Sequence, residues 1–348
     1  MNWTKKLLLW YADNKRSFEW RNTREPYKIW LSEIILQQTR TAQGLPYYIK
    51  FIETFPKLED LAIASEDEVL KLWQGLGYYS RARNLHSTAR FIYFECDGFF
   101  PNTFESIMKL RGVGDYTASA VASICFDIPQ AVVDGNVYRF FSRYFGIITP
   151  INSSQAQKEF KAKAMELIDT SEPGEFNQAL MEFGSIQCKP KKPSCTSCPF
   201  SSDCIAYNQN KINFLPVKIS KTKVINRFFS YLVISDSLNN FLMEKRIEKG
   251  IWQNLYQFPL IETNSLQKKV STVQNHIDSN EKLEIDVDQI KLWNTTPIIH
   301  KLSHQTLFIQ FWIISNSSTL KDGISKEKIE ELAVPVVIDN FMEDFFLN

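Results

Sequence analysis

Four of the six cysteines in this 348-residue chain fall within 17 positions, in the pattern Cys188-x6-Cys195-x2-Cys198-x5-Cys204. Thiolates at such short spacings can converge on one soft metal centre, either zinc or a [4Fe-4S] cluster. Structural zinc usually takes two paired Cys-x-x-Cys elbows, whereas this run has one elbow flanked by wider gaps. The spacing therefore favours the cluster and leaves zinc as the alternative. Disulfides are disfavoured, because the N-terminal stretch does not have the features of a secretory signal.

A carboxylate, Glu33, lies in the apolar stretch WLSEIILQQT, which has the character of a helix. Burial in such a helix would raise the pKa of Glu33 and make it a candidate general acid. The alternative is an ordinary helix charge facing solvent. The residues Gln37, Gln38 and Thr39 follow as an uncharged polar patch that can contact bases or sugars.

A second carboxylate, Asp134, stands in the sequence VVDGNVYR. Asp-Gly between apolar runs is typical of a β-hairpin turn. The same aspartate can instead cap a helix that starts at Asn136. The helical surroundings favour the cap.

Two glycine-containing stretches could contact nucleic acid. In LRGVGDYT, Gly112 and Gly114 predict a tight turn between helices whose backbone N–H groups can face a phosphate. A plain helix–turn–helix connection is the alternative. In GLGYYSRAR, residues 75–83, glycines, aromatic rings and arginines interleave, which suits stacking or wedging against bases. A helix that starts over the core is the alternative for this stretch.

The elements that must position these residues divide into two parts, as the length suggests. Residues 1–211 are predicted to be mostly helical, with apolar positions at helical spacing in 61–73, 118–126 and 160–168. Residues 212–227 are expected to form a basic linker. Residues 228–348 are predicted to form a smaller α+β domain, with strand-like runs at 228–235, 241–245 and 304–314. No stretch approaches the length of a membrane span, so we expect a cytoplasmic protein without membrane contact.

The charge is divided between the same two parts. Residues 1–227 carry 29 lysines and arginines against 23 acidic residues, a net charge of +6. Residues 228–348 carry 11 against 16, a net charge of −5. The basic part is the one expected to touch a polyanion.

Together these stretches resemble the helix-hairpin-helix DNA glycosylase superfamily, and within it the MutY-type adenine DNA glycosylases. WLSEIILQQT, GLGYYSRARNLH, LRGVGDYTASAV, VDGNVYRFFSR and the cysteine run occur in the family's order and spacing. The resemblance implies a mainly helical fold: a six-helix barrel with the hairpin motif, a cluster module, and then a smaller α+β Nudix-like domain. It also implies a [4Fe-4S] cluster on the four cysteines.

The resemblance implies a role for each carboxylate. Glu33 would protonate N7 of a flipped adenine, and Asp134 would stabilise or transiently attack the oxocarbenium-like sugar. Asn136 and Tyr116 would orient Asp134 and the sugar. Endonuclease III-type relatives carry a lysine where this chain has Tyr116, so base removal without strand cleavage is expected.

The resemblance also assigns DNA contacts. Gly112 and Gly114 would hold a backbone phosphate, with a monovalent cation at the same turn. The remaining expected contacts are Gln38 and Tyr78 as wedges in the base stack, Leu76 and Thr39 near the opposite base, and Arg21 and Arg81 as phosphate or pocket contacts.

The C-terminal part resembles the family's Nudix-like domain, which recognises 8-oxoguanine. Residues 252–260, WQNLYQFPL, look like its W-x-N-x-Y-x-F-P-L segment, and the carboxylate-rich Nudix box is not found downstream. Ser303 and His304 would read the lesion, and Leu302 stands where the family often has Phe. The implied partner of a monomeric enzyme is duplex DNA with A:8-oxoguanine or A:G mispairs, and the runner-up is an endonuclease III-like activity on oxidised pyrimidines.

Overall fold

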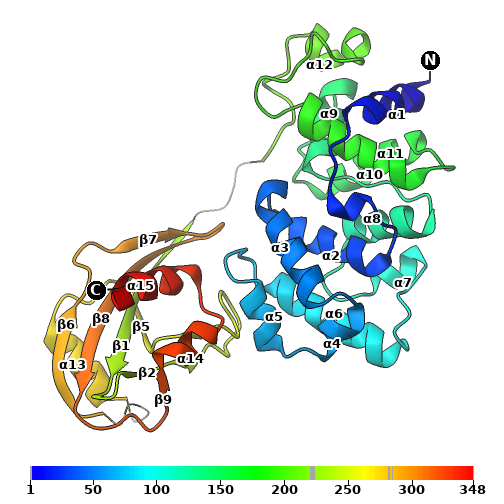
Figure 1. Ribbon diagram of the computed structural model, residues 1–348. Coiled ribbons are helices and arrows are strands. Elements are labelled where there is room, and N and C mark those ends of the chain that lie inside the picture. The colour runs from blue at the N-terminus through cyan, green and yellow to red at the C-terminus, as the bar shows by residue number, and fades with distance from the viewer. Residues whose placement is uncertain (1, 220–223, 281–282, 284, 348) are drawn as a thin grey trace. The chain divides into compact units, whose positions relative to one another are not determined.

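The computed structural model describes residues 2–219, 224–280, 283 and 285–347. The chain separates into two compact units (Figure 1). Of the described residues, the first unit contains 2–63 and 84–219, and the second contains 64–83, 224–280, 283 and 285–347. Neither unit is therefore a single continuous piece of chain.

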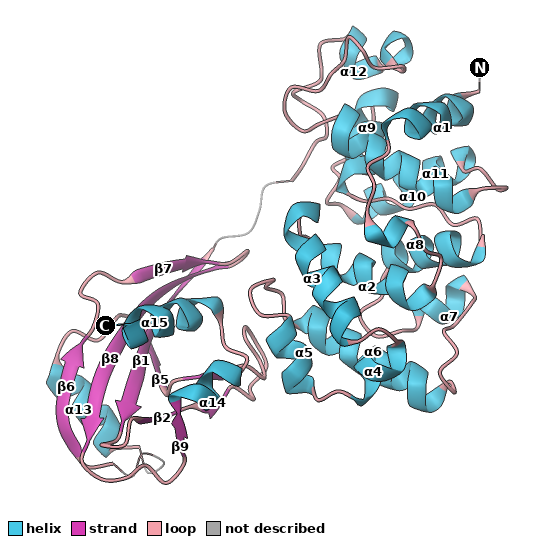
Figure 2. Cartoon of the chain, in the orientation of Figure 1, coloured by secondary structure: helices cyan, strands magenta, loops and turns pink. Residues whose placement is uncertain are grey.

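The first unit is built of helices (Figure 2). Its longer helices are α1 (Trp3–Asn14), α2 (Pro26–Leu36), α3 (Thr41–Thr54), α6 (Ser80–Glu95, which begins in the second unit), α8 (Asp115–Phe126), α9 (Gly135–Phe145), α10 (Ser154–Leu167) and α11 (Pro173–Glu182). Its shorter ones are η1 (Glu19–Arg21), α4 (Leu58–Ile63), α7 (Phe104–Met108), η2 (Phe183–Gln187), η3 (Ser201–Asp203) and α12 (Ile205–Asn208).

Aromatic side chains form one of the cores of this unit, under the helices α9, α10 and α11. Phe141, Phe160, Phe176 and Phe183 are fully buried there. Each large ring removes on the order of 150–250 Å² of surface from water, which makes such rings the main apolar contribution to this core. This core holds α9 and α11, the two helices whose ends face the candidate site.

The second unit contains a sheet of seven described strands. They are β1 (Ile225–Ser235), β2 (Asn240–Leu242), β5 (Leu260–Thr263), β6 (Val287–Leu292), β7 (Ile298–Lys301), β8 (Gln305–Asn316) and β9 (Gly323–Ser325). The order is β6-β8-β1-β2-β9, with β5 paired to β1 and β7 to β8. The central pair β1 and β8 is parallel over eleven residues, and the other pairs are antiparallel.

A small hairpin and several helices complete the second unit. They are β3 (Glu244–Lys245), β4 (Tyr256–Gln257), α5 (Glu66–Leu72), α13 (Val270–Asp278), α14 (Lys326–Glu331) and α15 (Val336–Leu347). The helix α5 belongs to the second unit although it lies far earlier in the sequence, and its contacts explain why. Asn254 Nδ2 donates to Glu66 Oε1 at 2.5 Å, and Asp67 accepts from Lys245 Nζ at 2.5 Å and from the Tyr256 hydroxyl at 3.2 Å.

The apolar pattern over residues 61–73 is carried by two helices rather than one. Ser65 caps α5 and forms a reciprocal capping box with Glu68, so a new helix begins after that serine and α4 and α5 are separate helices. The capping box in the sequence Ser-Glu-Asp-Glu is a local signal for this break.

The predicted fold class is confirmed: a helical part precedes a smaller domain with a mixed sheet. The boundaries at 1–211 and 228–348 stay a prediction, and residues 220–223 of the predicted linker lie outside the described residues. Among the described helices, none combines the length and apolarity needed to cross a bilayer.

A carboxylate-lined cavity as the candidate active site

A cavity of about 180 Å³ in the first unit brings together side chains that are far apart in the sequence. Six of the predicted site residues line it: Arg21, Glu33, Thr39, Tyr116, Asp134 and Asn136. Its apolar wall includes Trp20, Ile29, Leu36 and Met181. A partly apolar cavity with a few convergent polar groups is the usual form of a site for a small, flat ligand such as a base.

Glu33 lies on α2, whose buried residues run almost without a break from Tyr27 to Ile35. The helix starts at Pro26, where the missing N–H of proline costs no hydrogen bond. Glu33 is only 8% exposed, and burial raises its pKa from 4.5 to about 7. A hydrogen bond with Tyr116 opposes this rise, and the nearby Asp134 adds to it. The carboxyl group is thus suited to hold a proton near neutral pH.

Tyr116 is the second residue of α8, directly after the glycine turn. Its hydroxyl hydrogen-bonds Glu33 and lies 3.2 Å from the Met181 sulfur. Burial, together with the two carboxylates, raises the pKa of this phenol well above its usual value. Tyr116 therefore stays neutral and can act as a hydrogen-bond donor to a carboxylate.

Asp134 is the N-cap of α9, as the helical alternative predicted. Its Oδ1 accepts from the backbone N–H groups of Asn136 at 2.9 Å and Val137 at 2.8 Å, and its Oδ2 accepts from Asn136 Nδ2 at 2.6 Å. Burial raises the pKa of Asp134 above its usual value, and these hydrogen bonds oppose that rise. The helix N-terminus stabilises the ionised form at this position.

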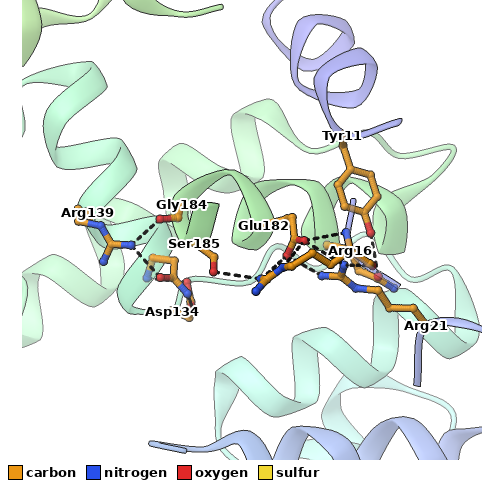
Figure 3. Close-up of polar contacts among 10 residues, drawn as sticks. Tyr11, Arg16, Arg21, Asp134, Arg139, Glu182, Gly184 and Ser185 are labelled. Atoms are coloured by element: carbon orange, nitrogen blue, oxygen red, sulfur yellow. Dashed lines mark hydrogen bonds and ion pairs between the residues drawn. The ribbon is translucent and has the colours of Figure 1, made fainter. Parts of the chain in front are cut away.

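Behind Asp134, a chain of polar contacts leads to the cysteine run. Arg139 Nη2 donates to the Gly184 carbonyl oxygen at 2.5 Å (Figure 3). The same nitrogen donates to Asn136 Oδ1 at 2.8 Å, and Arg139 Nε donates to the Cys188 carbonyl oxygen at 2.8 Å. Gly184 must lack a side chain, since a Cβ there would lie 2.6 Å from the Asn136 carbonyl oxygen. The backbone before the first cysteine is thereby fixed against the start of α9.

A second carboxylate system, not identified from the sequence, lies at the far wall of the cavity. Glu182, at the end of α11, accepts from Arg16 Nε and Nη2 at 2.8 Å each and from Arg21 Nη2 at 2.9 Å (Figure 3). Its side chain is 2% exposed. Burial would raise its pKa, but the hydrogen bonds from the two arginines outweigh burial and lower the pKa to about 2. Besides Asp134, the cavity therefore holds Glu182, which is ionised, and Glu33, which is readily protonated.

The glycine turn lies between α7 and α8. Gly112 has φ +78°, and a Cβ there would lie 2.7 Å from Cβ of Asn84, so only glycine fits. Gly114 is the N-cap of α8 and leaves the first N–H groups of that helix without a side-chain cap. Such a helix N-terminus can bind a phosphate.

The four cysteines of the run line one small cavity with the rings of Phe140, Tyr144, Phe183 and Phe200. Arg143 Nη1 lies 3.6 Å from Cys188 Sγ and donates to the Lys189 carbonyl oxygen at 2.7 Å. In the described part of the chain, no three His, Cys, Asp or Glu side chains are grouped tightly enough to hold a metal ion. The metal centre therefore stays a prediction, as does its identity.

Comparison with known proteins identifies the family. Residues 31–168 match the model of the HhH-GPD superfamily base excision DNA repair proteins, and residues 230–344 match the NUDIX domain. The chain is 35% identical to the adenine DNA glycosylase of Buchnera aphidicola subsp. Baizongia pistaciae over 323 residues, which cover 92% of this chain and 88% of the relative. The chain belongs to the adenine DNA glycosylase family. It is therefore a DNA-binding base-excision repair glycosylase, a hydrolase.

Solved structures agree on the helical part. A thermostable thymine-DNA glycosylase, 32% identical, superposes with a TM-score of 0.55 over 59% of this chain and 95% of its own. An endonuclease III–DNA complex, 22% identical, superposes with a TM-score of 0.52 over 60% of this chain and 94% of its own, which is a likeness of fold.

In this glycosylase, some predicted DNA contacts lie outside the cavity. Gln38 is exposed in the loop after α2, at φ +56°, a left-handed conformation that is uncommon for a side chain of this kind. Tyr78, at φ +48°, is 45% exposed in the second unit. Left-handed backbone at non-glycine positions is frequent at functional sites, and both residues present their side chains away from the core.

The second unit gathers the other predicted residues of this glycosylase. Leu76, Tyr78, Ser303 and His304 line one cavity of about 570 Å³, and the Tyr78 hydroxyl hydrogen-bonds the Ser303 hydroxyl. Arg81 is 8% exposed and lies 5.1 Å from the Trp73 ring centroid. Arg81 also donates to the carbonyl oxygens of Leu76 at 3.4 Å and Gly77 at 3.3 Å, so it supports the 75–83 loop, and its phosphate or pocket contact stays a prediction.

Proposed function

We propose that this glycosylase removes adenine paired with 8-oxoguanine, and with guanine, from duplex DNA, and that it hydrolyses the N-glycosidic bond without cutting the strand. The observation that carries the proposal is the pairing of Glu33 and Asp134 in one cavity, where burial raises the pKa of both carboxyls and the hydrogen bonds from Val137 and Asn136 oppose that rise at Asp134. A base inside a duplex cannot reach such a cavity, so the nucleotide must be flipped out of the stack.

In the proposed reaction Glu33 gives its proton to N7 of the flipped adenine, which then leaves as a neutral base. The sugar becomes oxocarbenium-like, and the ionised Asp134 stabilises that cation or attacks it transiently. Asn136 holds Asp134 through a hydrogen bond of 2.6 Å, and Tyr116 holds Glu33. Water completes the hydrolysis and leaves an abasic site.

Strand cleavage by a lyase step needs an amine that can attack the sugar. At the first turn of α8 this chain has the phenol of Tyr116, which cannot form a Schiff base. Lys161, on α10, binds Asp115, Ser119 and the Ala131 carbonyl oxygen with its ammonium group. We therefore propose a monofunctional enzyme, which hydrolyses the N-glycosidic bond and does not cut the strand.

For DNA, we propose that Gly112 and Gly114 bind a backbone phosphate, with a monovalent cation at the same turn. Gln38 and Tyr78 enter the base stack, and Thr39 and Leu76 lie near the opposite base. Ser303 and His304 read 8-oxoguanine. The support for the reading site is the cavity that Ser303 and His304 share with Tyr78 and Leu76. The enzyme is proposed to act as a monomer.

We also propose that Cys188, Cys195, Cys198 and Cys204 hold a [4Fe-4S] cluster. Four thiols around one cavity walled by aromatic rings, with Arg143 near the Cys188 sulfur, fit a thiolate-ligated cluster of net negative charge. The cluster would supply a fixed structure to the adjoining loop, which carries Lys189, Lys191 and Lys192. A Cys198→Ser variant should therefore lose visible absorbance and DNA affinity together.

The test of the function is base release from a duplex with one A:8-oxoguanine pair, with and without alkali. Wild type is expected to give strand breaks only after alkali, and Glu33→Gln almost none. Glu53→Gln, an exposed carboxylate on α3, is the matched control and should react like wild type. Strand breaks without alkali would overturn the monofunctional assignment and favour an endonuclease III-like activity. DNA binding without base release by wild type would overturn the catalytic assignment.

A further inference from the structure

The segment that leads to Asp134 is buried and has no regular secondary structure. Ala131 and Val132 are fully buried, yet residues 127–134 belong to neither a helix nor a strand. Buried backbone polar groups need partners, because a donor or acceptor that is left unpaired away from water destabilises the folded chain. The partners of this segment come from side chains on two other helices.

Lys161, on α10, supplies one set of partners. Its ammonium group donates to the Ala131 carbonyl oxygen at 2.7 Å, to Ser119 Oγ at 2.7 Å and to Asp115 Oδ1 at 2.9 Å. A lysine ammonium has three N–H donors, so all of them are used. The side chain is 19% exposed and also lies over the Phe104 ring, at 5.6 Å from its centroid.

Asn177, on α11, supplies the other set. It is fully buried, and its Oδ1 accepts from the Val132 N–H at 3.0 Å. Its Nδ2 donates to the Gln130 carbonyl oxygen at 2.7 Å and to Ser123 Oγ at 2.8 Å. Both amide hydrogens and the amide oxygen are therefore occupied.

The two side chains attach the segment to the same helix. Ser119 and Ser123 are four residues apart on α8, so they lie on one face of that helix. Tyr116 precedes Ser119 by three residues and belongs to the same face. The Tyr116 hydroxyl in turn hydrogen-bonds Glu33. Asp134 follows two residues after Val132, so the two attachments connect its backbone to the helix that carries Tyr116.

We propose that Lys161 and Asn177 are positioning residues for the glycosylase reaction, and that together they set the place of Asp134 relative to Tyr116 and Glu33. This inference rests on the proposed function. Neither side chain is among the residues that line the carboxylate cavity. A misplacement of a reacting group by about 1 Å can cost on the order of 100-fold in rate, so the loss of one attachment should be visible in the chemical step.

The test uses the full chain and measures single-turnover adenine release at saturating enzyme, with the active fraction titrated on DNA. Lys161→Met is expected to lower the rate constant at least tenfold while the Kd for the mispaired duplex stays within about twofold. Lys161→Arg, which keeps donors for the Ala131 carbonyl oxygen, should recover most of the rate. Lys163→Met, two residues along the same helix and ion-paired only to Glu166 among the described residues, is the matched control and should react like wild type.

A second measurement reports on Asp134 directly. Duplexes that carry a cationic pyrrolidine in place of the flipped sugar imitate the oxocarbenium-like state, and a neutral tetrahydrofuran site does not. Wild type should prefer the cationic duplex, and Lys161→Met and Asn177→Leu should lose at least fivefold of that preference. Failure of the proposed function would appear in the wild type, which would release no adenine. This inference is refuted if wild type is active and both variants keep its rate and its preference for the cation, or if they lose only melting temperature and active fraction.

Discussion

Replacing Glu33 with glutamine should abolish the acid and, above neutral pH, stabilise the protein. Burial raises the pKa of Glu33 from 4.5 to about 7 in the folded chain. Each pKa unit corresponds to about 1.4 kcal/mol, so holding the ionised carboxylate in the cavity costs on the order of 3 kcal/mol of folding free energy. Because folding raises this pKa, the protonated carboxyl makes its full contribution to the free energy of unfolding below pH 4.5. That contribution is lost as the pH rises through about 7.

Glutamine has nearly the same shape and no charge at any pH. The free energy of unfolding of Glu33→Gln, minus that of wild type, should therefore increase by up to about 3 kcal/mol between pH 4.5 and pH 8. Urea denaturation followed by tryptophan fluorescence at half-unit pH steps measures this difference. The increase should be concentrated between pH 4.5 and pH 7, and the curve should be flat above pH 8.

The exposed Glu53 on α3 provides the matched control, since Glu53→Gln changes the net charge by the same amount. Its difference from wild type should stay within about 0.5 kcal/mol over the whole range, as expected for a surface substitution. A Glu33→Gln difference that does not vary with pH would refute the reasoning, because it would mean that folding leaves the pKa of Glu33 unchanged.

The single-turnover rate of wild type should fall about tenfold per pH unit above pH 7, since only the protonated fraction of Glu33 can act as the acid; a flat profile from pH 7 to 9 would contradict this. In Tyr116→Phe the falling limb should move to higher pH, because the hydrogen bond that lowers the Glu33 pKa is lost. Glu182→Gln should lower the free energy of unfolding by about 3 kcal/mol, measured by denaturation, since two arginines lose a buried anionic partner. Ser303→Ala should reduce the preference for A:8-oxoguanine over A:G by about fivefold, the value of one hydrogen bond, and an unchanged rate ratio would argue against a role in reading the lesion.

Much of the site could be predicted from short stretches of sequence. The N-cap role of Asp134 needs only the residues that follow it, and the glycine turn needs only positive φ at Gly112. The burial of Glu33 could be expected from the apolar residues around it on α2. In each of these cases the decisive interaction lies within a few residues of the chain.

The rest depends on contacts between distant segments. Glu182 accepts a hydrogen bond from Arg16, which lies 166 positions earlier in the sequence. Lys161 donates to the carbonyl oxygen of Ala131, which lies 30 positions earlier. A single acid in a helix such as NQALMEFG usually faces solvent, so local rules predict an exposed Glu182. Its apolar neighbours on both sides are the only signal that could have suggested burial. The parallel pairing of β1 with β8 depends in the same way on a crossover that no local pattern specifies.

The grouping of residues 64–83 with the second unit has a consequence for the order in which the protein is made. Asp67 is synthesised 178 residues before Lys245 and 189 before Tyr256, its partners in the folded chain. At about 5–20 residues per second, the segment waits roughly 10–40 s outside the ribosome for these partners. During that interval the capping box between Ser65 and Glu68 can already fix the first turn of α5, because both residues lie within that turn. The helical part can therefore fold early, while this segment reaches its final arrangement only after most of the chain has been synthesised.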